Sequence, residues 1–219
     1  MTDALTPVVR VSETTFDGLR IRYDERVLTP RPWTELQSGW AVELLPGLPE
    51  GRVLELCCGA GHIGLAAVRR SRRRLVCVDR DPVAVEYAAS NAHDAGMSDR
   101  VEVRQAALVD ALEPDERFPL VIADPPWVAR ADTGRYPEDP IGAIDGGVGG
   151  LEVARRCLQV AAGHLTPGGA VLLQVGSRTQ VADLRDEART TGLMCTEVRM
   201  GLGGVIALFQ PPAGSVPGA

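Results

Sequence analysis

The sequence predicts an α/β fold of the Rossmann-like, doubly wound type, with a mostly parallel seven-stranded sheet. Strand-like and helix-like stretches alternate from residue 52 onward, which is typical of a parallel sheet covered by helices on both faces. A glycine-rich turn follows the first strand of this series. The last two strand-like stretches are joined by residues 201–204, a link too short for a parallel crossover, so we expect a C-terminal antiparallel hairpin.

The residues before the alternating series predict a short N-terminal β-hairpin and a helix. Extended segments at 8–13 and 19–24 flank Asp17-Gly18, a common hairpin turn. Apolar residues recur at helical spacing between 33 and 45, and the proline-rich residues 46–49 end that helix. We therefore divide the chain into an N-terminal extension, an α/β domain and a disordered tail, which cover residues 1–46, 47–210 and 211–219.

Within the α/β domain, strands and helices follow one another in order. The strand-like stretches are short and apolar, and they cover residues 53–58, 74–79, 100–105, 118–123, 170–175, 193–200 and 204–210. The helix-like stretches cover residues 61–70, 82–95, 150–165 and 178–191, with a shorter helix or turn near 107–112. The connection 128–148 is longer than usual, which favours a functional substrate lid over a passive link.

Composition and charge narrow the class of protein. A formal net charge of −6 disfavours non-specific binding to nucleic acid. No apolar run is long enough to span a membrane, and the first residues lack a signal-peptide core, so we expect a cytoplasmic protein. The five cysteines lack metal-ligand spacing, so we interpret them as reduced structural residues and predict no metal site. We interpret the basic run 69–74 as a solvated helix end, and His62, His93 and His164 as surface or packing residues.

Three successive strand ends carry residues suited to a nucleotide-like ligand, and ligands of open α/β sheets bind beyond such ends. Gly59 and Gly61 permit a tight turn and close backbone approach. Asp79 can accept hydrogen bonds from both hydroxyls of a ribose, and Ala107 offers apolar contact to an adenine face. A dinucleotide and S-adenosylmethionine both fit these features. Glu55 favours S-adenosylmethionine, because a carboxylate before the glycines would repel a pyrophosphate but suits an ammonium and a sulfonium.

A fourth strand end carries Asp124-Pro125-Pro126-Trp127 directly after the apolar run 118–123. Two consecutive prolines remove two N–H donors and stiffen the turn. A carboxylate and an indole then suit an amino group on a planar system, because oxygens accept its N–H bonds while the indole covers the plane. A Pro-Pro pair also serves simply to end a strand, so the tetrapeptide alone leaves both interpretations open.

Taken in order, these motifs resemble class I S-adenosylmethionine-dependent methyltransferases of the HemK-like type, which methylate the glutamine amide of peptide release factors. Residues 16–19 and 23–35 resemble the family's segment before the core, and 124–127 resemble its Asn-Pro-Pro-Tyr motif. Residues 139–151 resemble its Glu-Pro and Gly-Gly-x-Asp-Gly-Leu loop. The match runs from about residue 16 to 210, so we expect the family's N-terminal helical domain to be absent.

The resemblance implies roles for individual residues. The implied cofactor-binding residues are Glu55, Cys57, Gly59, Ala60, Gly61, Asp79, Arg80, Ala107 and Asp124. The implied substrate-binding residues are Trp33, Asp124, Pro125, Pro126 and Trp127, of which Asp124, Pro125 and Trp127 are catalytic.

Several residues depart from the family's pattern. Asp124 and Trp127 replace Asn and Tyr, and both variants resemble amino-methyltransferases that act on bases. Trp33 stands where the family has Glu, and Ala107 stands where an Asp commonly contacts the adenine amine. Gly149 stands where the loop has its Asp.

The sequence therefore predicts an S-adenosylmethionine-dependent N-methyltransferase acting on a planar amide or amino nitrogen. The acceptor is a protein, a small molecule or a nucleic acid, and the acidic charge disfavours the last. Two alternatives stay open, namely an NAD-dependent oxidoreductase that uses the same glycine turn, and a non-catalytic cofactor-binding module or partner subunit. No membrane partner is expected, and the oligomeric state is not predicted.

Overall fold

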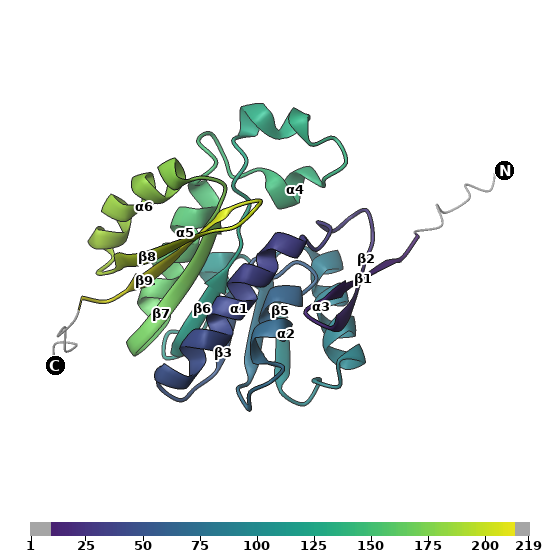
Figure 1. Cartoon of the computed structure of the whole chain (residues 1–219), viewed down its shortest axis with the longest axis horizontal. Coiled ribbons are helices and arrows are strands. Elements are labelled where there is room, and N and C mark those ends of the chain that lie inside the picture. The colour runs from purple at the N-terminus through teal and green to yellow at the C-terminus, as the bar shows by residue number, and fades with distance from the viewer. Residues whose placement is uncertain (1–9, 213–219) are drawn as a thin grey trace.

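The computed structural model describes residues 10–212, so residues 1–9 and 213–219, with most of the predicted tail, lie outside the described residues. Its centre is a seven-stranded sheet in the order β5-β4-β3-β6-β7-β9-β8 (Figure 1). The strands are β3 (Val53–Leu56), β4 (Leu75–Asp79), β5 (Val101–Gln105), β6 (Phe118–Ala123), β7 (Leu165–Val175), β8 (Met194–Met200) and β9 (Val205–Gln210). A separate two-stranded sheet pairs β1 (Ser12–Phe16) with β2 (Leu19–Tyr23).

The strand order confirms the predicted doubly wound, mostly parallel fold. β3 runs parallel to β4 and β6, and the parallel pairing continues outward to β5 and β7. β9 pairs antiparallel with both β7 and β8, which is the predicted C-terminal hairpin. The strand order reverses between β3 and β6, and this reversal opens a crevice at the carboxyl ends of the two strands.

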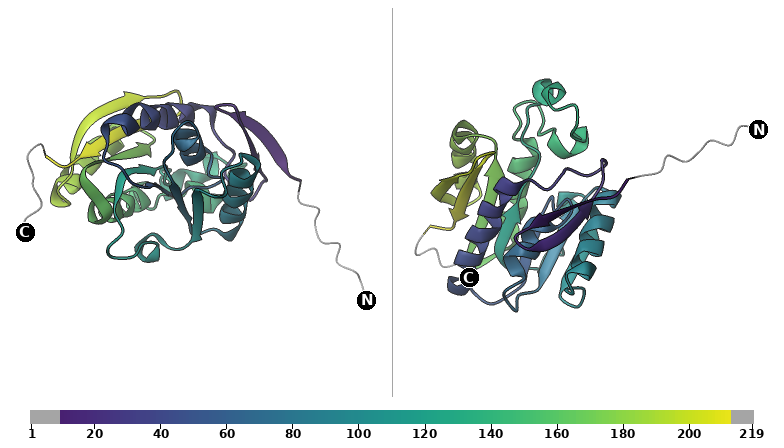
Figure 2. Two further views of the ribbon diagram at one scale, coloured as in Figure 1. Left: turned by 90° about the horizontal axis from the view of Figure 1, so that it is seen from below. Right: turned by 45° about the vertical axis from the view of Figure 1, so that its right-hand side comes forward.

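Two layers of helices cover the sheet (Figures 1 and 2). The helices are α1 (Glu35–Leu44), α2 (His62–Val68), α3 (Pro82–Asp94), α4 (Ile141–Ile144), α5 (Glu152–His164) and α6 (Arg178–Thr190). The first three share one apolar core with Val53 and Leu120, whereas α5 and α6 share the other with Leu54 and Val121. Adjacent residues of one strand thus enter opposite cores, which explains the continuous apolar runs of β3 and β6.

The N-terminal elements confirm the predicted hairpin and helix, but their bounds differ. β1 covers Ser12–Phe16 rather than 8–13, because the pairing of Phe16 with Leu19 leaves only Asp17 and Gly18 in the turn. Both turn residues have positive φ (43° and 72°), as tight hairpin turns require. The helix predicted over 33–45 is an α-helix flanked by short 3-10 turns at both ends.

Asn91 on α3 joins this hairpin to the sheet. Its Nδ2 donates to the carbonyl oxygens of Arg22 (3.0 Å) and Ala60 (2.9 Å), and its Oδ1 accepts from the N–H of Arg22 at 2.8 Å. The side chain is fully buried. One amide therefore links β2, α3 and the turn that follows β3.

Replacing Asn91 by alanine is expected to lower the free energy of unfolding by about 2 to 4 kcal/mol. The change removes three hydrogen bonds and leaves the backbone groups of half-buried Arg22 and of buried Ala60 without these partners. Urea denaturation measures the effect. His93→Ala, at an exposed position of the same helix, is the control and should shift the value by less than about 0.5 kcal/mol. Equal stability of the two variants would contradict the anchoring role.

Candidate active site

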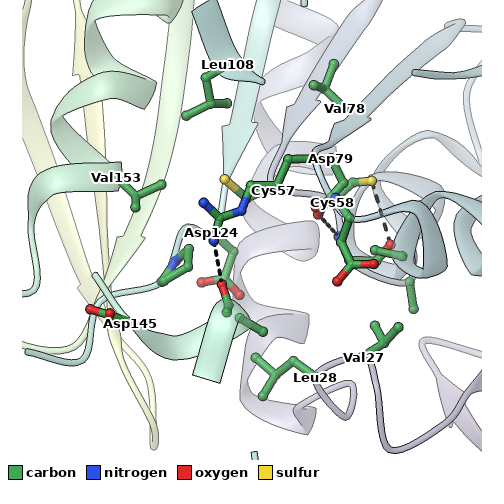
Figure 3. Close-up of a pocket in the computed structure, with 18 of the residues that line it drawn as sticks. Val27, Leu28, Cys57, Cys58, Val78, Asp79, Leu108, Asp124, Asp145 and Val153 are labelled. Atoms are coloured by element: carbon green, nitrogen blue, oxygen red, sulfur yellow. Dashed lines mark hydrogen bonds between the residues drawn. The ribbon is translucent and has the colours of Figure 1, made fainter. Parts of the chain in front are cut away.

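A cavity of about 510 Å³ lies at the carboxyl ends of β3, β4 and β6 (Figure 3). Its walls also include the segment before α1, the connection after β6 and the first turns of α5. Eight of the predicted site residues line it, namely Cys57, Gly59, Ala60, Asp79, Arg80, Ala107, Asp124 and Pro126. Five predicted site residues do not line it, namely Trp33, Glu55, Gly61, Pro125 and Trp127.

β3 ends at Leu56, so the strand predicted over 53–58 is two residues too long. The glycine-rich turn begins at the next residue. Cys57 adopts φ +57°, a left-handed conformation that costs a non-glycine residue roughly 1–2 kcal/mol. Gly59 (φ +52°) follows, and Gly61 (φ +77°) precedes α2. An added Cβ at Gly61 would lie 3.2 Å from the Cβ of Ala88, so Gly61 packs the turn against α3 instead of facing the cavity.

Asp79 at the end of β4 is held in one orientation by two backbone donors. Its Oδ2 accepts from the N–H of Gly59 at 2.9 Å, and its Oδ1 accepts from the N–H of Asp81 at 3.0 Å. Burial raises the pKa of this carboxyl. Because each carboxylate oxygen has two lone pairs, Asp79 retains acceptor capacity on the side that lines the cavity.

Asp124, directly after β6, also lines the cavity. Its Oδ1 accepts a hydrogen bond from Nε2 of Gln174 at 3.0 Å. Burial raises the pKa of Asp124 to about 7, and the bond from Gln174 opposes that shift by favouring the charged form. Gln174 is not among the predicted site residues. It is the single polar residue in the apolar stretch 170–175, and this is the signal in the sequence that could have identified it.

Backbone packing holds the turn that carries Asp124. Pro125 is buried, whereas Pro126 lines the cavity. An added Cβ at Gly146 would lie 2.6 Å from the carbonyl oxygen of Pro126, and one at Gly150 would overlap the carbonyl oxygen of Trp127. The glycine-rich loop after α4 therefore lies directly on the turn, and no larger residue fits at these two positions.

Both tryptophans predicted to contact the acceptor lie outside the cavity lining. The indole of Trp127 packs on the core of the α5–α6 face, and an added Cβ at Gly176 would be 2.5 Å from its Cε3. The ring of Trp33 lies against Gly203 in the turn between β8 and β9. Each ring fills a space that a glycine leaves open, and neither indole lines the cavity, so the stacking of Trp127 on the acceptor plane stays a prediction.

Glu55 is also placed differently from the prediction. It lies inside β3 and is 2% exposed, with Oε1 accepting from the N–H of Gly64 at 3.0 Å and Oε2 facing the Sγ of Cys77 at 3.4 Å. Burial raises its pKa to about 8. Its carboxyl therefore binds the first turn of α2 and does not line the cavity, so the expected contact of Glu55 with an ammonium stays a prediction.

His62, interpreted from the sequence as a surface or packing residue, lines the cavity. The hydroxyl of Thr34 donates to the carbonyl oxygen of Arg31 at 2.8 Å, so at its 3.3 Å contact with His62 it must accept from Nε2–H. Burial lowers the pKa of His62 to about 3, so the ring is neutral. Nδ1 is therefore an unprotonated acceptor, and it is buried without a hydrogen-bond partner among residues 10–212.

The predicted lid segment forms one side of the cavity and is tied to the residues opposite. Arg31, in the segment before α1, binds both carboxylate oxygens of Asp139 at 2.5 and 2.7 Å. Arg80 donates to the carbonyl oxygen of Gly142 at 3.2 Å. These bonds join the N-terminal extension and the end of β4 to one connection, and several residues of the segment 26–34 line the cavity beside it.

Metal centres and membrane-spanning helices are not found in the part of the chain that the structure describes. No group of three or more His, Cys, Asp or Glu side chains within residues 10–212 is arranged to hold a metal ion. None of the helices in the same range is long and apolar enough to cross a membrane.

The fold and the position of the site define the class of protein. A family model described as the methyltransferase small domain matches residues 36–136. A methyltransferase from Pyrococcus furiosus superposes with a TM-score of 0.65 at 20% identity, covering 88% of each chain. A SAM-dependent methyltransferase from Agrobacterium tumefaciens superposes with a TM-score of 0.66 at 14% identity, covering 94% of this chain and 72% of that one. The shared fold is that of methyltransferases.

Sequence similarity narrows the class to one family. The chain is 35% identical over 199 residues to the release factor glutamine methyltransferase of Deinococcus radiodurans, covering 88% of this chain and 69% of the relative. It is 33% identical over 183 residues to the ribosomal protein uL3 glutamine methyltransferase of Bordetella pertussis, covering 80% and 61%. The chain therefore belongs to the HemK-like family of glutamine methyltransferases. It spans about three fifths of the length of the curated relatives it matches.

Proposed function

We propose that this protein is an S-adenosylmethionine-dependent N-methyltransferase that acts on a planar amide or amino nitrogen. The observation that carries the proposal is the position of Asp124, whose carboxyl lines the same cavity as Gly59 and Asp79. The cavity lies where the strand order reverses, the usual ligand site of an open α/β sheet. Membership of a methyltransferase family favours a methyl donor over NAD as the ligand of this site.

The residues of the cavity fit S-adenosylmethionine. Its volume of about 510 Å³ is within the range of roughly 300–1,000 Å³ for small-molecule sites. Asp79 suits the ribose hydroxyls, and Ala107 with Leu108 and Val153 suits the adenine. The backbone at Gly59 is open to the methionine part. When bound, the cofactor supplies an electrophilic methyl group on a positively charged sulfur.

The protein's part in the reaction is to orient the acceptor nitrogen for an in-line displacement. Ionised Asp124 accepts an N–H bond from the acceptor and so directs its nitrogen toward the methyl group. The bound cofactor would supply the methyl group and keep the electron pair of the broken S–CH₃ bond, and the acceptor nitrogen would lose one proton. A carboxylate with a pKa of about 7 is a suitable base for that proton at neutral pH.

The acceptor that we propose first is the side-chain amide of a glutamine in a protein. Relatives that match the chain are named for glutamine methylation of a ribosomal protein or a release factor. An amide nitrogen is planar and carries two N–H donors, which match an acceptor-only carboxylate. Amines of small molecules and of bases present the same donors, but the net charge of −6 disfavours a nucleic acid.

Calorimetric titration with S-adenosylhomocysteine and, separately, with NAD tests the cofactor. We expect binding of the first and not of the second, and the reverse result would overturn the proposal. Transfer of a labelled methyl group into fractionated lysate, followed by hydrolysis and a search for methylglutamine, tests the acceptor. Label in small-molecule or nucleic-acid fractions would show that the acceptor is not a protein glutamine. Cofactor binding without methyl transfer to any fraction would support a non-catalytic module.

We expect His62→Phe to weaken the binding of S-adenosylhomocysteine by about 10- to 100-fold. His62 lines the cavity while its Nδ1 is covered and without a partner among residues 10–212, so a rotation of the ring would let Nδ1 accept from the α-ammonium of the ligand; a hydrogen bond to a charged group contributes roughly 1.5–3 kcal/mol. 5′-Methylthioadenosine lacks the amino-acid part, so its affinity should change by less than about threefold. Calorimetry with both ligands measures the difference, and an equal loss for both would contradict this role.

A further inference from the structure

Gln174 is a buried polar residue near the carboxyl end of β7. It does not line the cavity, but it contacts Asp124, which does. It is 2% exposed, and its Nε2 donates to Oδ1 of Asp124 at 3.0 Å. The register of the two parallel strands pairs Ala123 with Leu173, so residues 124 and 174 are neighbours at the ends of β6 and β7. The contact therefore follows from the central architecture of the sheet.

The side chain of Gln174 is confined on its other side by the C-terminal hairpin. Its backbone pairs with Ile206 of β9, and an added Cβ at Gly204 would lie 3.4 Å from both Cγ and Cδ of Gln174. The amide thus lies between the turn that joins β8 to β9 and the carboxyl of Asp124. Packing on both sides holds it in a single orientation.

The chemistry of the contact allows only one direction of donation. An ionised carboxylate has acceptors only, and the amide of glutamine donates only through Nε2. Oδ1 of Asp124 is therefore engaged by Gln174, and Oδ2 is the oxygen left for a ligand in the cavity that Asp124 lines.

We propose that Gln174 is a positioning residue for methyl transfer: by donating to Oδ1 it holds the carboxyl of Asp124 so that a hydrogen-bond acceptor faces the acceptor nitrogen. This inference rests on the proposed function. It adds that residue 174 determines whether residue 124 presents an acceptor or a donor to the cavity.

An exchange of donor and acceptor between the two positions separates this role from simple packing. In Asp124→Asn, Gln174 still donates to the Oδ1 of the new side chain, so Nδ2–H₂ faces the cavity and meets the N–H groups of the substrate. Adding Gln174→Glu reverses the bond, because the glutamate accepts from Nδ2 and the amide oxygen then faces the cavity. The double variant should therefore regain part of the methyl-transfer activity that each single substitution removes.

The experiment compares the wild type, Asp124→Asn, Gln174→Glu and the double variant by methyl-transfer kcat/KM and by calorimetric binding of S-adenosylhomocysteine. We expect Asp124→Asn to lose at least about 100-fold in kcat/KM, and the double variant to recover at least about tenfold of that loss. Affinity for S-adenosylhomocysteine should agree within about threefold in all four proteins. Asp124→Asn combined with Gln159→Glu, which adds the same charge change at an exposed position, should show no recovery.

The pH profile provides a second readout. In Gln174→Glu two carboxyls are adjacent and share a proton, so the rise of kcat/KM with pH should move to higher pH. Glu55 and Cys57 are titratable groups close to Asp124, and the same cavity is lined by further charged residues, among them Asp79, Arg130, Asp145, Glu152 and Arg156; all are unchanged in these variants. A double variant no more active than Asp124→Asn, with binding of S-adenosylhomocysteine intact, would overturn the role of Gln174. Failure of the wild type to bind S-adenosylhomocysteine would instead overturn the proposed function.

Discussion

Asp124→Ala is expected to reduce methyl transfer by at least about 10³-fold, while the affinity for S-adenosylhomocysteine changes by less than about threefold. The change removes the carboxyl that accepts the N–H bond of the substrate and takes up its proton, two roles that contribute most at the transition state. The cofactor's expected contacts at Gly59 and Asp79 are not altered. Single-turnover methyl transfer and calorimetry on the same preparation measure the two quantities.

Asp110→Ala is the matched control, because it removes an exposed carboxyl beside the cavity. It should keep the activity of the wild type. Unchanged methyl transfer by Asp124→Ala would remove Asp124 from the reaction and with it the proposed mechanism.

The pH dependence of the wild-type enzyme follows from the same carboxyl. Burial raises the pKa of Asp124 to about 7, and only its ionised form accepts both the hydrogen bond and the proton. The kcat/KM of methyl transfer should therefore fall as pH decreases below about 7 and level off above about 8. A flat profile between pH 6 and pH 8 would contradict the assignment.

Glu55→Gln is expected to stabilise the protein at pH 8 by about 2 to 4 kcal/mol relative to the wild type. Burial raises the pKa of Glu55 from an ordinary value of 4.5 to about 8, so the folded protein favours the neutral form. The contribution of Glu55 to stability is complete below pH 4.5 and is lost as the pH rises toward about 8. A glutamine keeps the neutral shape, accepts from the N–H of Gly64 and never ionises, so it avoids this loss.

Urea denaturation across pH 5 to 8 measures this effect. The free energy of unfolding of the wild type should fall by up to about 1.4 kcal/mol per pH unit from Glu55 alone, and Asp124 adds to the fall because its pKa is also raised. Glu55→Gln should flatten the slope, whereas Glu86→Gln, at an exposed position, should not. Asp24 and Glu116 have pKa values lowered to about 2, so their contributions are lost only at more acidic pH. A slope unaffected by Glu55→Gln would contradict the burial of a neutral carboxyl.

The fold could be predicted because it depends on local patterns that alternate along the chain. The apolar runs of β3 and β6, the helical spacing of α3 and the short link 201–204 each determine one element or connection without reference to the rest. The end of β3 could not be predicted in the same way. Cys57 has a residue type that suits a strand, and its positive φ is imposed by the turn that brings Gly59 to Asp79.

The sequence predicts which strand ends form the site, but it does not predict in which direction each side chain points. Asp79 and Asp124 line the cavity because Asp79 ends β4 and Asp124 directly follows β6, both parallel strands next to the reversal of strand order. Glu55 lies inside its strand, and alternation turns its side chain toward α2. Trp127 turns to the opposite core because Gly176, distant in sequence, leaves room for its ring. His62 and Gln174 gain importance only from contacts across the fold, with Thr34 and Asp124.

The placement of β9 has a consequence for how the molecule assembles. Val205–Gln210 is the last strand within residues 10–212, yet it lies between β7 and β8, both of which precede it. Until these residues leave the ribosome, the apolar edge of β7 has no strand to pair with, and unpaired apolar edges of this kind promote aggregation. A chain that stops shortly before Val205 would expose that edge permanently. The sheet can therefore be completed only after β9 has left the ribosome.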